Sequence, residues 1–177
     1  MADLPEMTFG HIGLNVTKMD PMVEFYTKVM GFRLTDRGRG SRGGELAFLS
    51  RNPEEHHQVV LAEGRPPNNV STVNQMSFRV EHFSEVRAMY ERLVEAGVKG
   101  IAPIDHGAAL SVYFPDPEGN RVEVYWATPW YIQQPHAKPI DFTRSDDEIV
   151  GACEAKCKAD PTYQPMDEWK KAFARGG

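Results

Sequence analysis

A strand-and-helix pattern occurs twice in this chain, and the repeat constrains the fold more than any other feature of the sequence. Residues 8–16 alternate apolar and polar side chains, which is typical of a half-buried strand, and residues 75–80 alternate in the same way. The shift from His11 to Gln75 is 64 residues. The same shift places three further pairs together: Ile12 with Met76, Leu14 with Phe78 and Val16 with Val80. A shared shift of this kind indicates an internal duplication.

Each copy of the repeat predicts a strand, a helix and three further strands. The last strand of the first copy is predicted at 57–62, and the last three of the second copy near 98–102, 110–114 and 121–126. In the first copy the helix begins at Asp20, a favourable N-cap followed by proline, and it ends at Gly31. We therefore predict an α+β fold with two tandem βαβββ modules, whose sheets form an open, curved trough. The predicted boundaries are about 7–64 and 73–127 for the modules, 65–72 for a Pro/Asn-rich linker and 128–177 for a C-terminal helical extension.

The second module ends in a predicted β-hairpin at residues 111–126. Two apolar runs flank residues 116–120, whose aspartate, proline and glycine are typical of a turn. Because side chains alternate along a strand, Tyr113 and Glu123 should lie on the same face of the hairpin. A carboxylate between valines in a strand is unfavourable unless it is paired, and the alternative is that Glu123 lies on a solvated face.

Strand parity brings several polar side chains to the inner face of the predicted trough. They are His11, Gln75, Tyr113 and Glu123, with His57 added if Val59 and Leu61 also line that face. An imidazole and a carboxylate on separate strands suit a three-ligand site for non-haem Fe(II) or another divalent ion. We therefore predict that His11, Gln75 and Glu123 bind a metal ion, although each alone is also consistent with an ordinary packed or solvated residue.

These residues, together with His106-Gly107 and residues 111–123, resemble the vicinal oxygen chelate superfamily. The sequence looks most similar to the type I extradiol (catechol meta-cleaving) dioxygenases and to single-domain glyoxalase and bleomycin-resistance-like proteins. The resemblance covers residues 7–127, which we expect to form one domain of this type. It assigns the metal carboxylate to Glu123 and the first histidine ligand to His11. The second histidine position is occupied by Gln75, a ligand type used by glyoxalases and epimerases of the superfamily.

The resemblance also implies three catalytic residues and a reaction. His57 matches the second member of a histidine pair, which acts as acid and base; Tyr113 matches a tyrosine that contacts the substrate hydroxyl; His106 resembles a histidine that stabilises bound oxygen. The implied function is a metal-dependent extradiol-type dioxygenase, an oxidoreductase that cleaves a catechol-like aromatic substrate with O₂. Fe(II) is the expected metal, with Mn, Ni, Co and Zn as alternatives.

Two other functions remain open at this point. A glyoxalase- or epimerase-type isomerase or lyase would use a divalent metal other than iron, with Gln75 as a ligand. A metal-free small-molecule binding protein of the bleomycin-resistance kind would need neither His11 nor Glu123, so their presence disfavours it.

Composition excludes other classes. The net charge of −5 and the pI of about 5.7 argue against a nucleic-acid-binding surface. The sequence contains no run of about 18 apolar residues that would span a membrane. Residues 1–7 are expected to form a loose leader without the features of a secretory signal, which favours a cytoplasmic protein.

The C-terminal extension contains both cysteines. Cys153 and Cys157 lie four residues apart on a predicted helix, a poor geometry for a disulfide, so both should be reduced. A capping box at Ser145–Glu148 predicts the start of this helix. An appendage that buries little surface by itself is expected to cover the trough or a second subunit, and we predict a homodimer.

Overall fold

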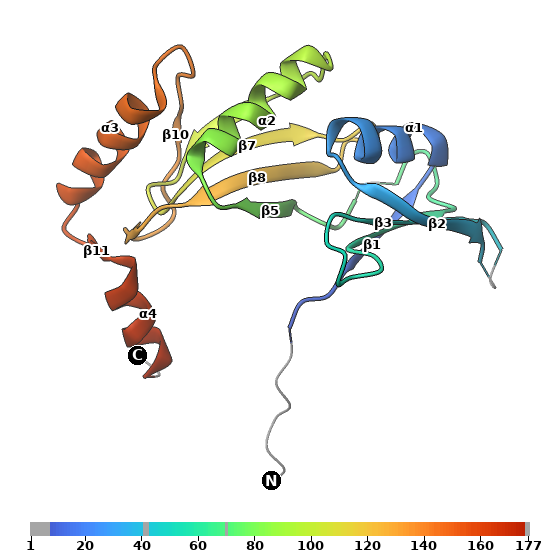
Figure 1. Cartoon of the computed structure of the whole chain (residues 1–177), viewed down its shortest axis with the longest axis horizontal. Coiled ribbons are helices and arrows are strands. Elements are labelled where there is room, and N and C mark those ends of the chain that lie inside the picture. The colour runs from blue at the N-terminus through green and yellow to red at the C-terminus, as the bar shows by residue number, and fades with distance from the viewer. Residues whose placement is uncertain (1–7, 41–42, 70, 176–177) are drawn as a thin grey trace, which may run out of the picture. The chain divides into compact units, whose positions relative to one another are not determined.

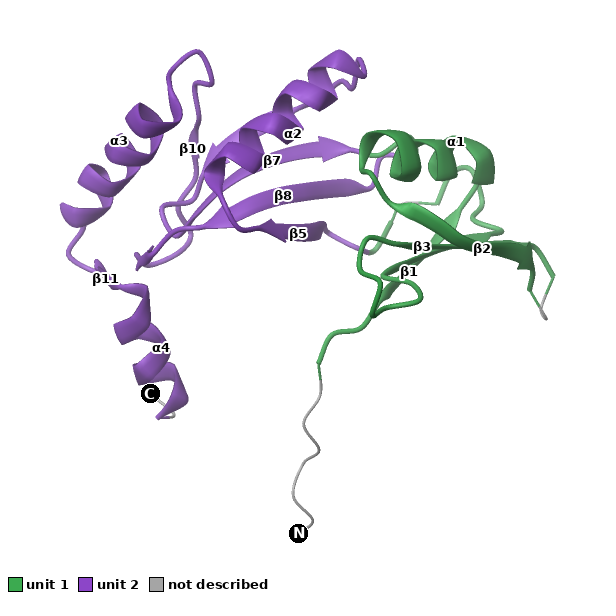
Figure 2. Ribbon diagram, in the orientation of Figure 1, with its two compact units in different colours: residues 1–72, 116–118 green, residues 73–115, 119–177 purple. Residues whose placement is uncertain are grey.

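The computed structural model describes residues 8–40, 43–69 and 71–175, so the predicted leader at 1–7 lies outside the described residues. The chain divides into two compact units, which are coloured separately in Figure 2. Unit 1 consists of residues 1–72 and 116–118, and unit 2 of residues 73–115 and 119–177.

Unit 1 has one helical region and a four-stranded sheet (Figure 1). Its elements are β1 (Ile12–Val16), α1 (Met19–Glu24), the π-helical segment η1 (Phe25–Val29), β2 (Arg33–Arg39), β3 (Glu45–Ser50) and β4 (Val59–Glu63). The strand order is β1-β4-β3-β2, with β1 parallel to β4 and the other pairs antiparallel. Apolar side chains of the helical region and the sheet form the core, and Met22, Tyr26, Leu49 and Leu61 are fully buried.

Unit 2 repeats this arrangement in β5 (Met76–Val80), α2 (Phe83–Glu95), β6 (Ala102–Asp105), β7 (Ala109–Pro115) and β8 (Arg121–Ala127). Strand β5 is parallel to β8, and β8, β7 and β6 follow in antiparallel order. Helix α2 lies against β7 and β8 (Figure 1) and buries Val86 and Leu93. In both units the first strand is therefore parallel to the fourth, as expected for a duplicated module, and the predicted α+β fold with open sheets is confirmed.

The C-terminal extension belongs to unit 2. It contains β9 (Trp130–Tyr131), β10 (Lys138–Pro139), α3 (Asp146–Lys158), β11 (Gln164–Pro165) and α4 (Met166–Ala174). Strand β10 joins the edge of the unit 2 sheet beside β6, and β9 pairs with β11. The predicted capping box is confirmed, because Ser145 Oγ accepts from the Glu148 N–H while the Glu148 carboxylate accepts from the Ser145 N–H. Both cysteines on α3 are free thiols, as predicted.

None of the helices within the described ranges is long and apolar enough to cross a lipid bilayer.

Three predicted boundaries are wrong. Helix α1 begins at Met19 with Lys18 at the N-cap, so Asp20 lies in the first turn instead of capping it. Strand β4 begins at Val59, two residues after the predicted start at His57. Strand β6 covers residues 102–105, whereas the sequence pattern indicated a strand near 98–102.

The tip of the β7–β8 hairpin supplies the cap that Lys18 lacks. Asp116 Oδ1 accepts from the Glu118 N–H at 3.0 Å, which is the Asx turn expected from the sequence. Glu118 Oε1 in turn accepts from the backbone N–H groups of Thr17 and Lys18, at 2.6 and 2.7 Å. The Tyr26 hydroxyl, on η1, donates to Asp116 Oδ2 at 3.2 Å. These bonds place residues 116–118 in unit 1.

The substitution Glu118→Gln is expected to lower the free energy of unfolding by about 1–2 kcal/mol, because the carboxylate accepts two N–H groups at the start of a helix. Glu24→Gln is the matched control, since Glu24 is exposed and its ion pair with Lys28 contributes at most about 0.5 kcal/mol. Urea denaturation followed by circular dichroism measures both. Equal effects of the two substitutions would show that the hairpin tip does not stabilise α1.

Candidate functional site

Glu123 is the centre of a buried polar cluster in unit 2. Its side chain on β8 is only 6% exposed, and the register places Glu123 between Tyr113 on β7 and Ser77 on β5. The Ser77 hydroxyl donates a short hydrogen bond to Glu123 Oε2, and the Gln75 amide donates to the same oxygen at 2.9 Å. The same carboxylate is the register partner of Tyr113 and raises the pKa of the phenol. The predicted pairing of Tyr113 with Glu123 on one face is therefore confirmed.

The chemistry of this cluster fits a divalent cation. The donors to Glu123 are a hydroxyl and an amide, and a phenol lies beside it; all three are neutral, so none of them matches its charge. A buried carboxylate is stabilised by a positive partner, which a metal ion would provide. Gln75 is already beside the carboxylate, and rotation of its amide would present Oε1, the ligand atom, in place of Nε2.

Within the described residues no three His, Cys, Asp or Glu side chains are placed to hold a metal ion. Gln75 is the amide next to the buried carboxylate. The structure brings two of the three predicted metal ligands together in unit 2. The third, His11, belongs to unit 1.

In unit 1, His11 and His57 lie side by side. Their ring centroids are 4.4 Å apart, and His57 also contacts the ring of Phe48 at 5.2 Å. His57 Nδ1 is 2.9 Å from His56 Nδ1, and His56 Nε2 is 2.8 Å from the Asp36 carboxylate. Desolvation lowers the pKa of His57, the neighbouring His11 and His56 rings lower the pKa further, and Glu55 opposes them. This environment favours a neutral imidazole.

The sequence placed His57 on the inner face only if Val59 and Leu61 also line that face, and this condition is not met. Val59 and Leu61 are completely buried, and Leu61 is paired in parallel register with Leu14, a core residue of β1. Residues in such a register share a face, so Val59 and Leu61 lie on the core side of β4 rather than on its open face. His57 precedes the strand, where the alternation of faces does not apply, and it reaches His11 from the connection before β4.

Tyr113 and His106 form the second part of the site in unit 2. The Tyr113 hydroxyl is 2.9 Å from His106 Nε2, and the two rings meet edge to face. The guanidinium of Arg121 lies over the Tyr113 ring at 4.0 Å from its centroid. Burial raises the pKa of Tyr113 to about 12, the Glu123 carboxylate contributes to the increase, and Arg121 and Gln75 oppose it. Tyr113 is therefore a neutral phenol that is bonded to His106 and lies opposite Glu123 in the strand register.

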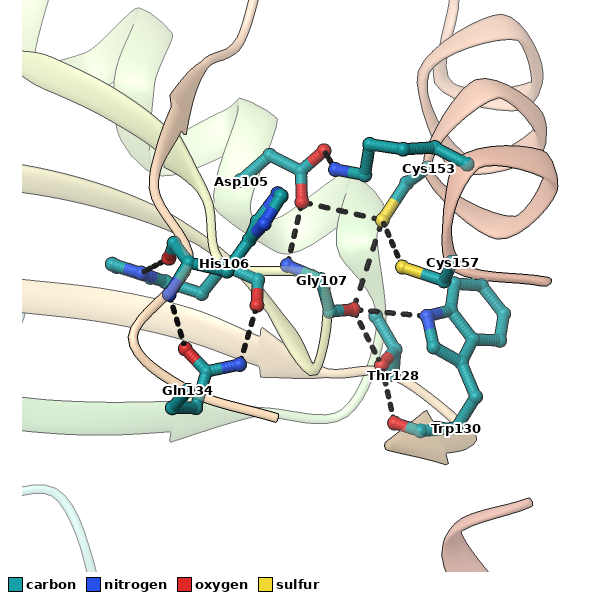
Figure 3. Close-up of polar contacts among 10 residues, drawn as sticks. Asp105, His106, Gly107, Thr128, Trp130, Gln134, Cys153 and Cys157 are labelled. Atoms are coloured by element: carbon teal, nitrogen blue, oxygen red, sulfur yellow. Dashed lines mark hydrogen bonds and ion pairs between the residues drawn. The ribbon is translucent and has the colours of Figure 1, made fainter. Parts of the chain in front are cut away.

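The C-terminal extension surrounds the loop that carries His106 (Figure 3). The His136 carbonyl oxygen lies 2.7 Å from His106 Nδ1, and the Gln134 side chain donates to the His106 carbonyl at 2.8 Å. The Gly107 carbonyl accepts from the Trp130 indole at 2.9 Å and from the Thr128 hydroxyl at 3.0 Å. The extension therefore contacts the candidate site directly.

Sequence reasoning missed Ser77, Arg121 and Gln134. Ser77 and Arg121 had a usable signal, because each lies two residues from a predicted ligand on the same strand face: Ser77 from Gln75, and Arg121 from Glu123. Gln134 had none, because it lies in an irregular segment whose path is set by tertiary contacts.

Comparison with known proteins agrees with this architecture. Residues 8–124 match the family model described as the glyoxalase/bleomycin resistance protein/dioxygenase superfamily. Over 122 residues, 66% of its length, the chain is 30% identical to biphenyl-2,3-diol 1,2-dioxygenase 2 of Rhodococcus globerulus, of which it spans 60%. Two further relatives are named for their metals. The iron-dependent extradiol dioxygenase of Rhodococcus jostii is 28% identical, over 67% of this chain and 42% of the relative. The manganese-dependent 2,3-dihydroxybiphenyl 1,2-dioxygenase of Geobacillus genomosp. 3 is 26% identical, over 67% of this chain and 36% of the relative.

Among solved structures, the glyoxylase/bleomycin resistance protein/dioxygenase domain from Frankia sp. EAN1pec has the same fold. The TM-score is 0.60 at 22% sequence identity, and the match covers 71% of this chain and all of that domain. The family model covers more than half of the chain. The chain therefore belongs to the glyoxalase/bleomycin resistance protein/dioxygenase superfamily, also known as the vicinal oxygen chelate superfamily.

Proposed function

We propose that this protein is a metal-dependent extradiol-type dioxygenase that cleaves a catechol-like aromatic substrate with O₂. The observation that supports the proposal most strongly is the position of Tyr113, which is hydrogen-bonded to His106 and paired in the register with the buried carboxylate of Glu123. A metal carboxylate, a phenol for the substrate hydroxyl and an imidazole beside it are the groups that this chemistry requires. Relatives named as dioxygenases, two of them acting on a biphenyl diol by name, support the same reaction class.

The proposed metal ligands are His11, Gln75 and Glu123, with Fe(II) as the expected ion. Gln75 and Glu123 are supported by their contact in unit 2. His11 is included because it is the counterpart of Gln75 in the sequence repeat. When bound, a divalent ion lowers the pKa of a coordinated catechol hydroxyl, as it does for water.

The remaining residues take the substrate-directed roles in this proposal. The Tyr113 hydroxyl orients one catechol oxygen by a hydrogen bond, and its place between Glu123 and His106 keeps it fixed. His57 accepts the proton of the second hydroxyl and returns it to the ring-opened product. His106, behind Tyr113, forms a hydrogen bond with the Tyr113 hydroxyl and keeps the phenol in place beside the substrate.

The test is an oxygen-uptake assay on protein that has been stripped of metal, loaded with Fe(II) without oxygen and screened over substituted catechols. We expect uptake to accompany formation of a yellow ring-opened product. Tyr113→Phe, which retains the ring but removes the hydroxyl, should lower kcat by roughly 10²-fold or more, the range for a group that transfers or directs a proton. His11→Ala should abolish uptake and weaken iron binding. Unchanged uptake in His11→Ala would contradict the metal assignment.

Gln75 favours a second candidate function. An amide is a weaker donor than imidazole, and an isomerase or lyase can use a divalent metal other than iron held by such a ligand. If this candidate is correct, the protein purified without added ions should contain Ni, Co, Zn or Mn and show no oxygen uptake with Fe(II). Protein that binds none of these ions tightly would instead indicate a metal-free binding protein, the third possibility.

We further propose that residues 7–127 form the catalytic domain, that residues 128–177 form an accessory extension, and that the protein acts as a cytoplasmic homodimer on small molecules. The contacts of the extension with the His106 loop support an accessory role in catalysis.

A further inference from the structure

The ring of His106 is held by a hydrogen bond at each nitrogen. Nδ1 lies 2.7 Å from the backbone carbonyl oxygen of His136, and Nε2 lies 2.9 Å from the Tyr113 hydroxyl. A carbonyl oxygen can only accept, so Nδ1 must carry a proton. In the neutral ring, Nε2 is then the unprotonated nitrogen, and it accepts from Tyr113. The His136 carbonyl therefore selects the tautomer that His106 presents to the site.

One side chain holds both partners of this contact in place. The Gln134 amide donates from Nε2 to the His106 carbonyl at 2.8 Å, and its Oε1 accepts from the His136 N–H at 3.1 Å (Figure 3). The same Nε2 also approaches the Ile132 carbonyl at 3.3 Å. Gln134 thus connects the backbone of residue 106 to the backbone of residue 136.

The loop itself has separate supports. Asp105 forms an ion pair with Lys156 of α3 and accepts from the Gly107 N–H at 2.6 Å. The Gly107 carbonyl is held by Thr128 and Trp130. These contacts do not involve Gln134, so loss of its amide should leave the loop in position and release mainly the His136 segment.

We propose that Gln134 is a positioning residue, which fixes His106 with a proton on Nδ1 and a free Nε2 directed at Tyr113. The effect of Gln134 on catalysis rests on the proposed function, whereas its effect on the tautomer of His106 does not. Without Gln134 the His136 carbonyl moves relative to His106, the ring samples both tautomers, and an Nε2–H competes with the Tyr113 proton for the same space. The extension outside the family domain would therefore contribute directly to the chemistry of the site.

The experiment is ¹⁵N NMR of the imidazole nitrogens in metal-free protein, compared for the parent chain, Gln134→Glu and Gln133→Glu. Gln134→Glu keeps the shape and the acceptor but loses the donor, whereas Gln133 is exposed and provides the matched charge change one residue away. We expect a single Nδ1–H tautomer for His106 in the parent and in Gln133→Glu, and a mixture of tautomers in Gln134→Glu. Gln134→Ala serves as the second variant if the glutamate variant does not fold.

Kinetics separates this proposal from the proposed function. In a dioxygenase, Gln134→Glu should lower kcat about 10-fold, as for other residues that orient an active-site histidine, and leave KM within a factor of two. A parent protein without oxygen uptake would overturn the dioxygenase assignment, while the NMR result would still decide the role of Gln134. An unchanged His106 tautomer in both Gln134 variants would overturn the positioning role.

Discussion

The substitution Glu123→Gln should remove the proposed metal site while leaving the fold intact. The carboxylate is the one anionic ligand proposed, and its replacement by an amide leaves a ligand set with no charge to oppose that of a divalent ion. We expect affinity for Fe(II) or Mn(II) to fall by at least about 100-fold, more than is usual when only a residue supporting a ligand is changed. Calorimetric titration and metal analysis of purified protein measure this loss.

Stability provides the accompanying control. The donors around Glu123 in the metal-free protein are neutral, so the isosteric Gln should not lower the free energy of unfolding by more than about 1 kcal/mol. Glu91→Gln removes the same charge from an exposed position on α2 and should change neither metal affinity nor stability. Retained metal affinity in Glu123→Gln would place the ion elsewhere.

The second large effect is expected for Gly107→Ala. Gly107 has φ of +72°, a conformation that costs a residue with a side chain about 1–2 kcal/mol. A Cβ at this position would clash with Ile132 Cδ1 and would lie 2.7 Å from Ile132 Cγ1, and Ile132 is itself buried. Overpacking of this kind costs a further 1–3 kcal/mol or so. We therefore expect Gly107→Ala to lower the free energy of unfolding by about 2–5 kcal/mol.

Gly97→Ala is the matched control for the backbone term. Gly97 has φ of +70°, but a Cβ there would meet no atom within 4 Å. It should cost only about 1–2 kcal/mol, and the difference between the two variants isolates the contact with Ile132. Thermal denaturation of both proteins measures the difference. Equal losses would show that the extension is not packed tightly under the His106 loop.

The parts of the fold that were predictable from sequence are those fixed by short-range periodicity. The alternation along 111–126 predicted the contact of Tyr113 with Glu123, because a tight turn sets the register of a hairpin. The repeat predicted the same sequence of strand, helix and three strands in both units, since each copy must bury one face of its sheet against its own helix.

The same logic failed where a residue lies outside a regular strand. His57 precedes β4, so the alternation of faces along the strand does not extend to it. Val59 and Leu61 lie on the core face, whereas the prediction for His57 needed them on the open face. Gln134 and His136 lie between β9 and β10 in an irregular segment, and their contacts with His106 span 28 and 30 residues. No periodic pattern encodes such contacts, which depend on where the whole extension packs.

The participation of residues 116–118 in unit 1 has a consequence for biosynthesis. A nascent chain that has emerged only as far as residue 72 contains β1 to β4 but lacks the Glu118 carboxylate that accepts the N–H groups at the start of α1. Ribosomal synthesis usually lets N-terminal regions fold first. Here the N-terminal half of the duplication reaches its final hydrogen bonding only after most of the second half has been translated.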